Sequence, residues 1–488
     1  MASYSYNGNL DSQNGVGEIA MKDVSNPNIR TNTDHFTTSS TTSPADTETT
    51  KTVKERFFEF GADSTIHGVR FVTNTEIGIF RRLLWGLILC GFFTWLSFNV
   101  TNSFAQYISR PVSSVVGVTY VTNIDFPTIT LCNYNQIRRS KIDDTKLTLL
   151  NTIFGNSATN INWAKYEPFL KQANFSLIDE LTKTAHDIRD MLLWCRWRGV
   201  ELCDYTDFKT TITDWGVCHT FNNPHDKNDV LTVNQAGSGY GLHLRLNAEQ
   251  HEYTSTENPG AGFKVYLHPR GVRPLVKELG FSVSPGFETA VSVSVTQVNN
   301  LPHPYSKCRP STESLNFSET YTVPGCIQEC KEMFVIDICK CKEFRYQGNA
   351  TPCDLKTANE CIGDAEDKFI KENKNAECDC PKSCDGVVYN ARLSHAYFPN
   401  DLLVKTISVG MNLSEGQIRK NILDVRVFFE ELSYSNVTQI PAYTSTSLQS
   451  DIGGSMGLFV GMSILSVVEF IDFLLVSLWN RCCKVHRR

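Results

Sequence analysis

The sequence predicts a membrane protein of the α+β class, in which two transmembrane helices flank a large disulfide-rich α/β domain with a central β-sheet. Three observations lead to this prediction. Apolar segments lie at residues 83–100 and 452–479, near the two ends of the 488-residue chain. Fourteen of the 17 cysteines lie between these segments. The same stretch contains runs of β-branched residues separated by Gly, Asn and Pro, a pattern typical of strands.

Basic residues beside the two apolar segments predict the topology. Arg81 and Arg82 precede the first segment, and Arg481 and Lys484 follow the second. Because Lys and Arg next to a span favour the cytoplasmic side, we expect a multi-pass plasma-membrane protein with both termini in the cytoplasm. The even number of cysteines between the spans indicates an oxidising, extracellular location. The same region holds sequons, and glycans are expected at Asn174, Asn316, Asn349, Asn412 and Asn436.

These features divide the chain into six parts. Residues 1–54 are rich in Ser, Thr and Asn, which predicts a disordered cytoplasmic tail. The net charge is −6 and no basic block occurs, which argues against a nucleic-acid partner. A more apolar segment, residues 55–80, precedes the first span, which is expected at 81–101. The extracellular domain follows at 102–450, the second span at 451–480 and a short cytoplasmic tail at 481–488.

The extracellular domain is expected to mix strands and helices. Ser414 and Gln417 form a capping box, which predicts the start of a short helix. Residues 422–432 have the composition of a strong strand leading to the second span, so a central sheet should continue directly into the membrane helices. Other strands are expected within 114–133, 210–221, 242–248, 262–268 and 289–298, and helices within 163–195, 326–345 and 354–375.

The second apolar segment predicts a helix that lines a pore. Its 28 residues would form a helix ~42 Å long at ~1.5 Å per residue, more than the ~30 Å hydrocarbon core requires, so it must tilt, break or extend into water. Gly453, Gly457 and Gly461 form a stripe without side chains. On one continuous helix, Asp472 would lie about 20° and Glu469 about 80° from Gly461. Carboxylates at membrane depth are costly unless they face water, an ion or a partner.

Two other interpretations of this segment were weighed. It could be an anchor helix whose glycines pack and whose acids lie in the inner headgroup region. Residues 453–457 also satisfy the G-x-S-x-G pattern of hydrolase nucleophiles, but that pattern needs a strand, a turn and a helix in an aqueous α/β domain. An enzyme is therefore not expected, and no cofactor is expected.

The spacing of the cysteines predicts a ladder of bridges. Residues four apart share one face of a helix, and residues two apart share one face of a strand, so two such pairs can join a helix and a strand antiparallel. Zinc is the competing interpretation, but nearby histidines are scarce and the location is extracellular, so no metal site is expected. The expected rungs are Cys326–Cys380 and Cys330–Cys378, with Cys308–Cys384 as a third, while Cys339 and Cys341 can pair with Cys353 and Cys361.

Five sequence marks, together with the 14 cysteines between the two spans, resemble the degenerin, epithelial sodium channel and acid-sensing ion channel family. The marks are His67-Gly68, FPTITLCN at 126–133, HDIRDMLLWCRWRG at 186–199, LGFSVSPGFET at 279–289 and DIGGSMGLFVGMSIL at 451–465. The resemblance covers roughly residues 55–480 and is closest to acid-sensing and peptide-gated members.

This resemblance implies a homo- or heterotrimer in membrane lipid with an amiloride-sensitive, sodium-preferring pore through which Na⁺ permeates. The family's filter matches Gly461, Met462 and Ser463, where the helix is interrupted, although acid-sensing members usually have alanine at the middle position. The outer pore mouth would include Ser450 and Asp451. The lower pore would include Glu469, Asp472, His67 and Gly68. The implied bridges are Cys132–Cys218, Cys195–Cys203, Cys308–Cys384, Cys326–Cys380, Cys330–Cys378, Cys339–Cys361 and Cys341–Cys353.

The gating ligand is the least determined feature. Proton gating is associated with a histidine pair after the first span, yet residues 106–114 contain no histidine. The remaining candidate ligand-sensing acids could attract the cationic end of a short neuropeptide, which is the favoured ligand, with protons as the alternative. An ATP-gated trimeric channel and a two-pass binding protein without a pore are further alternatives. The candidate acids are Glu252, Asp364, Glu366 and Asp367.

Overall fold

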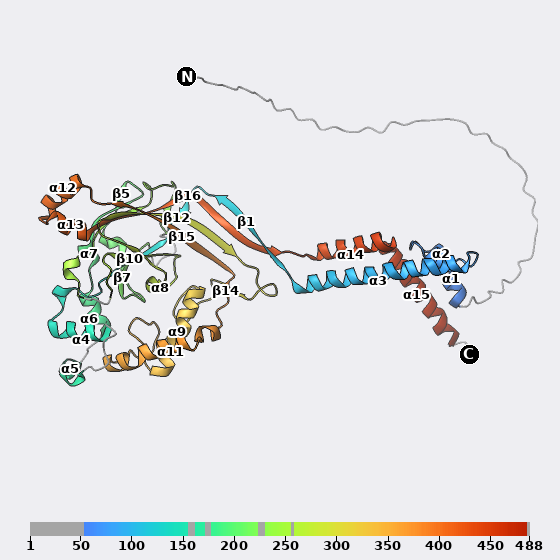
Figure 1. Ribbon diagram of the computed structural model, residues 1–488, viewed down its shortest axis with the longest axis horizontal. Coiled ribbons are helices and arrows are strands. Elements are labelled where there is room, and N and C mark those ends of the chain that lie inside the picture. The colour runs from blue at the N-terminus through green and yellow to red at the C-terminus, as the bar shows by residue number, and fades with distance from the viewer. Residues whose placement is uncertain (1–52, 155–161, 171–176, 223–229, 255–257, 486–488) are drawn as a thin grey trace, which may run out of the picture.

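The computed structural model describes residues 53–154, 162–170, 177–222, 230–254 and 258–485. A β-rich domain, residues 112–441, stands at one end of a long stem of helices (Figure 1). The chain enters the domain from α3 (Ile79–Ser109) and leaves it into α14 (Ser445–Val460). Both connections are therefore direct, as the sequence predicts.

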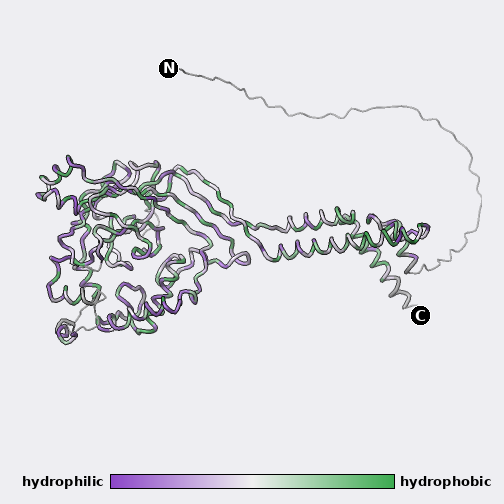
Figure 2. The backbone as a smooth tube through the Cα atoms, in the orientation of Figure 1, coloured by the Kyte–Doolittle hydropathy of each residue, from purple (hydrophilic) through white to green (hydrophobic). Residues whose placement is uncertain are grey.

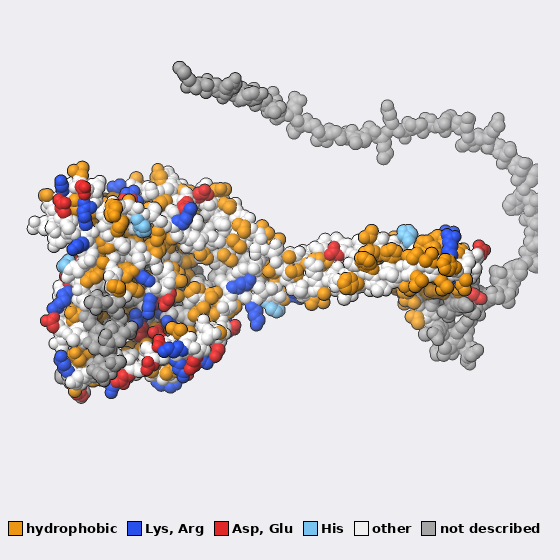
Figure 3. Space-filling model, viewed as in Figure 1, with side chains coloured by type: hydrophobic (Ala, Val, Ile, Leu, Met, Phe, Trp, Pro, Cys, Tyr) orange, Lys and Arg blue, Asp and Glu red, His pale blue; other side chains and the backbone are white. Residues whose placement is uncertain are grey.

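The stem is apolar along its length. Figure 2 shows hydrophobic residues along α3 and α14, which lie side by side, and Figure 3 shows hydrophobic side chains gathered towards the end remote from the domain. By length and composition α3 could cross a membrane, with a mean hydropathy of 1.7 over its most apolar window. The segment predicted as the second span is instead α14 followed by α15 (Ile464–Val485), and the pair is bent by 77°. The excess length of that segment is accommodated by a break.

The larger sheet of the domain has seven strands in the order β15-β12-β16-β9-β4-β5, and β1 pairs with β16. β16 runs parallel to β12 and antiparallel to β9 and β1, so it joins the domain core to the stem. The strands are β1 (Val112–Tyr120), β4 (Leu192–Trp197), β5 (Glu201–Leu202), β9 (Leu242–Asn247), β12 (Phe287–Asn299), β15 (Asp385–Tyr397) and β16 (Ile422–Pro441).

A second sheet packs against the first. Its order is β11-β10-β3-β7-β6, and two smaller pairs are β2 with β8 and β13 with β14. The main core lies between the sheets, where Leu244 and Val427 of the larger sheet meet Leu131 and Phe263 of the smaller one. The strands are β2 (Ile124–Asp125), β3 (Thr128–Asn133), β6 (Phe208–Ile212), β7 (Val217–Phe221), β8 (Thr232–Val233), β10 (Phe263–His268), β11 (Phe281–Val283), β13 (Cys308–Arg309) and β14 (Lys382–Ser383).

Short helices surround the sheets. α12 and α13 lie at the end of the domain remote from the stem (Figure 1), and Ser414 and Gln417 form the expected capping box of α13. A π-helical stretch, Ala358–Ile362, connects α10 to α11. The helices of the domain are α4 (Asp144–Phe154), α5 (Trp163–Leu170), α6 (Leu177–Thr184), α7 (Ile188–Met191), α8 (Val276–Leu279), α9 (Val323–Cys339), α10 (Leu355–Thr357), α11 (Gly363–Lys371), α12 (Asp401–Met411) and α13 (Glu415–Asn421).

Seven disulfides staple the domain, and they are the seven pairs that the family resemblance implied. Three of them join α9 and the strand β13 to the segment that follows α11, which makes the three-rung ladder. The pairs are Cys132–Cys218, Cys195–Cys203, Cys308–Cys384, Cys326–Cys380, Cys330–Cys378, Cys339–Cys361 and Cys341–Cys353.

Three details of the predicted secondary structure were wrong. Of the helix expected over residues 163–195, the described residues form α5, α6 and α7, with a break between α6 and α7, and its last residues are in β4, because pairing with β9 outweighs the local helical spacing. The helix expected to reach residue 345 ends at Cys339, since Lys340 adopts a left-handed conformation with φ of +59°. Cys378 and Cys380 form the expected bridges from a segment that belongs to no strand.

Candidate functional site at the broken helix

The helix break, residues 461–463, separates α14 from α15. Gly461 has φ of +65°, a left-handed conformation that glycine adopts without a steric penalty. Its N–H donates to the Gly457 carbonyl at 3.1 Å, and the Met462 N–H donates to the Met456 carbonyl at 3.2 Å. These two bonds satisfy carbonyls at the end of α14, so the helix ends here by a glycine C-terminal motif.

Two serines restart the helix. The Ser466 N–H donates to Ser463 Oγ at 3.3 Å, and the Ser463 N–H donates to Ser466 Oγ at 3.1 Å. Ser466 is only 1% exposed. This reciprocal arrangement supplies acceptors for N–H groups that the first turn of a helix leaves without intrahelical partners. The break is therefore built by local sequence on both sides.

A segment before the first span, residues 53–78, folds back against this break. It contains α1 (Val53–Asp63) and α2 (Val69–Thr73). The His67 N–H donates to the Val460 carbonyl at 3.2 Å. A Cβ built on Gly461 would lie 1.6 Å from His67 Nδ1, so the imidazole occupies the space that any side chain at position 461 would need. Gly68, with φ of +92°, then turns the chain into α2.

A polar contact joins the same segment to α15. Thr65 Oγ1 lies 2.7 Å from Ser466 Oγ and donates to Glu469 Oε2 at 3.1 Å. Phe60 stacks on Phe473 with ring centroids 4.6 Å apart. The structure thus brings together His67, Gly68 and Glu469, which the resemblance assigned to the lower pore. Thr65 and Ser466 were not singled out in the sequence, although a serine one turn before a carboxylate in an apolar helix was an available signal.

The helical phase argument for the two carboxylates was wrong. It assumed one continuous helix, but the 77° bend at residues 461–463 means that Glu469 and Asp472 lie on a different helix from the glycine stripe. On α15 they are three residues apart and share a face. Within the single chain the stripe is open at Gly453 and Gly457, where a Cβ would meet nothing within 4 Å, and is covered by His67 at Gly461.

The residues assigned to the outer mouth lie on α14, near the domain. Asp451 is exposed and accepts a 2.5 Å hydrogen bond from the Tyr443 hydroxyl, which comes from the connection after β16. Ser450 precedes it and is also exposed. At ~1.5 Å per residue, Asp451 lies ~15 Å along the helix from Gly461. The charge therefore lies well outside the break.

One of the candidate ligand-sensing acids is held inside the domain. Glu252 Oε2 accepts from the Ser140 N–H at 2.8 Å, and Oε1 lies 4.0 Å from Arg138 Nη2. Burial alone would raise the pKa of Glu252, but the hydrogen bonds from Ser140 and the charge of Arg138 together lower it. This carboxylate is ionised and already paired.

The other candidate acids lie on α11. Glu366 accepts a 2.5 Å hydrogen bond from the Tyr346 hydroxyl and lies 3.5 Å from Lys331 Nζ. Burial would raise the pKa of Glu366, and these two partners lower it. Asp364 and Asp367 are exposed, and Asp367 pairs with Lys371 at 2.8 Å. The partners of Glu252 and those of Glu366 do not overlap, so the structure presents two separate acidic sites.

Several buried titratable groups were missed in the sequence, and Asp424 and His268 are two of them. Asp424 of β16 is 1% exposed and accepts from Arg245 at 2.8 and 3.0 Å and from His243 at 3.0 Å. His268 of β10 is 2% exposed and lies 2.9 Å from Thr130 Oγ1. Burial lowers the pKa of His268 to about 4. Both residues lie within apolar strand segments, and this was the available signal that their side chains could be buried.

The sequons occupy different environments. Asn349 and Asn412 are exposed in loops, Asn316 is exposed beside α9, and Asn436 lies within β16, where its amide donates to Thr119 Oγ1 at 2.7 Å. Asn174 lies outside the described residues. Among the residues that the structure describes, no group of three or more His, Cys, Asp or Glu side chains is placed to hold a metal ion.

Residues 60–473 match the amiloride-sensitive sodium channel family. The chain belongs to this family. It is therefore related to ion channels of the membrane rather than to enzymes, and the G-x-S-x-G pattern in α14 has no catalytic meaning. The match includes most of the segment before the first span, the whole β-rich domain and the first part of α15, up to residue 473.

Curated relatives agree with this assignment. The chain is 33% identical over 447 residues to acid-sensing ion channel 1 of Gallus gallus, covering 87% of this chain and 84% of the relative. It is 32% identical over 441 residues to acid-sensing ion channel 2 of Mus musculus, covering 85% of each. A solved structure of a proton-activated chloride channel aligns with 81% of this chain and 98% of its own at 8% identity, but a TM-score of 0.32 is too low to support an argument.

Proposed function

We propose that the chain is a subunit of a trimeric, sodium-preferring channel of the plasma membrane, opened by an extracellular ligand. The observation that carries this proposal is the break at residues 461–463, against which His67 of the segment before the first span packs. The carbonyls of Met456, Gly457 and Val460 accept hydrogen bonds within the chain, so the proposal assigns the cation to carbonyls of the break itself, such as those of Gly461 and Met462, which can replace part of its hydration shell.

The proposed topology places two spans in the membrane, α3 and the α14–α15 pair, with both termini in the cytoplasm and the β-rich domain outside. The seven disulfides of that domain support this orientation, because such bonds persist in oxidising surroundings. Cys90, a free cysteine, lies in α3. In this proposal the cysteines of the extracellular domain are oxidised to disulfides, whereas Cys90, within the membrane span, is a free thiol.

In this proposal the charged residues along α14 and α15 act on the cation in sequence. Asp451, near the domain, raises the local concentration of cations, because an exposed carboxylate attracts them at a range set by the salt concentration. Gly461, Met462 and Ser463 set the preference among cations. Glu469 and Asp472 receive the ion below the break.

The proposed ligand is a short peptide with a cationic end. Glu252 and Glu366 have lowered pKa values and existing partners, so mild acidification leaves them ionised. A peptide could instead bind by charge to the exposed carboxylates of α11, where Asp364 and Asp367 face solvent. Protons are the second candidate, favoured by the names of the acid-sensing relatives.

Current recorded from cells that express this chain alone tests the proposal. We expect an amidated cationic peptide to open an amiloride-blocked sodium current, and a step to pH 5 without peptide to give little current. The Gly461→Val variant, checked for surface expression, is the control for current carried by other channels. A large, rapid sodium current at pH 5 without peptide would establish protons as the ligand instead. Absence of current under both stimuli, with the chain at the surface, would contradict a channel formed by this subunit alone.

A further inference from the structure

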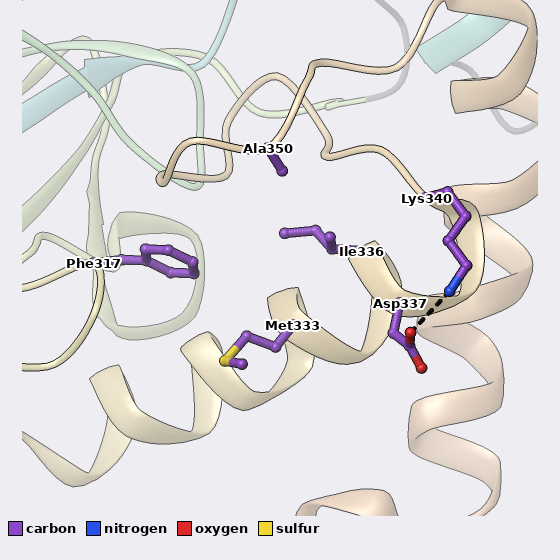
Figure 4. A pocket seen from close by; sticks show the side chains of 6 residues that line it. All are labelled: Phe317, Met333, Ile336, Asp337, Lys340 and Ala350. Atoms are coloured by element: carbon purple, nitrogen blue, oxygen red, sulfur yellow. Dashed lines mark hydrogen bonds and ion pairs between the residues drawn. The ribbon is translucent and has the colours of Figure 1, made fainter.

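An open apolar pocket of about 450 Å³ lies beside the C-terminal half of α9. Figure 4 shows Met333 and Ile336 on the helix, Phe317 across the opening and Ala350 on the loop above, all directed towards the same space. Met333 is 51% exposed. The Asp337–Lys340 ion pair, at 2.9 Å, borders one end. Exposed apolar side chains around a hollow favour contact with a ligand or another part of the molecule.

The opening is held in shape by two contacts of Phe317. Its N–H donates to Glu329 Oε2 at 2.9 Å, and Glu329 is a buried carboxylate of α9. Its ring lies against the backbone of Gly348, where an added Cβ would approach Phe317 Cε1 to 2.3 Å. The ring is therefore fixed between α9 and the loop that carries Ala350, so the pocket is preformed.

A sequon lies at the edge of this pocket. Asn316, Phe317 and Ser318 have the N-x-S pattern, and Phe317 itself lines the opening. Asn316 is exposed, and its Nδ2 donates to Glu329 Oε1 at 2.7 Å. The same nitrogen lies 4.0 Å from Met333 Sδ. One amide hydrogen is therefore used by Glu329, while the other side of the nitrogen faces the pocket.

We propose that Asn316 carries an N-linked glycan whose first N-acetylglucosamine covers this pocket. In glycosylation Nδ2 bonds to C1 of the sugar and loses one proton, and the lipid diphosphate that carried the sugar leaves. The remaining N–H continues to donate to Glu329, and the sugar replaces the contact of Nδ2 with Met333 Sδ. The sugar then starts beside Met333 Sδ, and its C–H groups pack on the Phe317 ring and the Met333 thioether.

A second sequon competes for the same pocket. Asn349 immediately precedes Ala350, which lines the opening from the other side. No contact joins the Asn349 side chain to a lining residue among the described hydrogen bonds, whereas Asn316 contacts Met333 directly. The observations therefore favour Asn316 as the origin of the sugar.

The experiment measures oxidation of Met333 by hydrogen peroxide, which gives one oxygen to the sulfur and leaves as water. Full-length protein is purified with its glycans, and Met333 sulfoxide is quantified by mass spectrometry. Ser318→Ala removes the sequon but keeps Asn316 and its bond to Glu329, and Ser318→Thr keeps the sequon. Asn349→Gln removes the competing glycan. Met411, the last residue of α12, packs against the cluster of Phe398, Val404, Ile418 and Ile422 and serves as an internal reference.

We expect Ser318→Ala to remove the glycan and raise the oxidation rate of Met333 several-fold, with no change at Met411. Ser318→Thr and Asn349→Gln should leave Met333 protected. Loss of the glycan without faster oxidation would overturn the proposal, and so would exposure of Met333 by Asn349→Gln alone.

This inference rests on the proposed extracellular placement of the domain, but the two can fail separately. A protein with a glycan at Asn412 and none at Asn316 contradicts only the covered pocket. A protein with no glycan at any described sequon of the domain contradicts the placement as well.

Discussion

The β-rich domain and the stem are stabilised in different ways. In the domain every residue of β3 is buried, and seven disulfides join neighbouring segments. In the stem only Leu96 of the 31 residues of α3 is buried within the chain. The stem contacts that define the break are few and specific, chiefly His67 with Gly461 and Thr65 with Ser466.

This difference predicts that substitutions affecting folding and substitutions affecting permeation lie in different parts of the molecule. A change in the domain removes packing or a covalent staple, so we expect it to reduce the amount of folded protein. A change at the break removes one close contact and little buried surface, so we expect it to alter current while the protein still reaches the surface. The following experiments test that separation, from the largest expected effect to the smallest.

The largest effect is expected for Gly461→Val. A branched side chain at φ of +65° is strained, and its Cβ would overlap the His67 imidazole. Current should disappear, or the sodium-to-potassium ratio should change, while surface biotinylation stays near the wild-type level. Gly454→Ala is the matched control, since a Cβ there meets nothing within 4 Å. Equal currents from both variants would show that residue 461 does not contribute to the pore.

The next effect concerns the cysteine ladder. Replacing Cys330 and Cys378 together by serine removes one rung without leaving a free thiol. The domain should lose roughly 2–4 kcal/mol of unfolding free energy, and surface expression should fall. The ratio of sodium to potassium permeability in the remaining channels should not change. Cys90→Ser, in the stem, is the control and should leave expression unaltered. A changed ion preference in the double variant would break the proposed separation.

A smaller effect is expected from acid acting on His268. Its pKa of about 4 in the folded state lies below the ~6.5 of an unfolded histidine, so the unfolded chain takes up the proton first. The stabilisation is complete above pH ~6.5 and is lost as the pH falls towards 4. At pH ~5 this group should cost the domain roughly 2 kcal/mol.

The measurement is the thermal unfolding midpoint of detergent-solubilised protein at pH ~7.5 and ~5. His268→Gln keeps a polar partner for Thr130 and should reduce the difference between the two midpoints. If the variant and the wild type lose the same stability on acidification, other groups control the response. In that case, any change of current at low pH would have to be tested separately for partial unfolding and for gating by protons.

The smallest effect is expected for Asp451→Asn. Removing one exposed carboxylate should lower single-channel conductance, most visibly at ~10 mM salt, where screening extends over ~30 Å instead of ~8 Å. Tyr443→Phe is the matched control, because it removes the hydrogen bond and keeps the charge. Equal conductance loss in both variants would indicate that the bond, not the charge, matters.

Local sequence predicted the stem better than the domain. The excess length of the second apolar segment required a tilt, a break or an extension, and the family resemblance placed an interruption at Gly461, where the structure has the break. The contact of His67 with Gly461 joins residues almost 400 positions apart, and no local pattern encodes it. It was accessible only through the role that the resemblance assigned to His67.

The domain shows where local patterns are insufficient. Residues 192–197 continue a helical spacing, but they become β4 because β9 offers a pairing partner on the sheet. The bridges of Cys378 and Cys380 were predicted correctly although the segment is not a strand, because two residues of an extended chain share a face with or without sheet hydrogen bonds. The separation of Glu252 from α11 depends on the tertiary fold, which spacing cannot provide.

The pairing of β1 with β16 restricts how the domain can act on the stem. The register runs without interruption from Val112 opposite Pro441 to Tyr120 opposite Ser433, and each strand continues within a few residues into α3 or α14. Sliding one strand along the other by one residue would break the whole ladder and turn each side chain to the opposite face. Twisting the paired strands about their long axis keeps these hydrogen bonds, and β12, which also pairs with β16 over residues 434–438, twists with them. We therefore expect a movement of the domain to rotate the ends of α3 and α14 rather than to displace them along the strand axis.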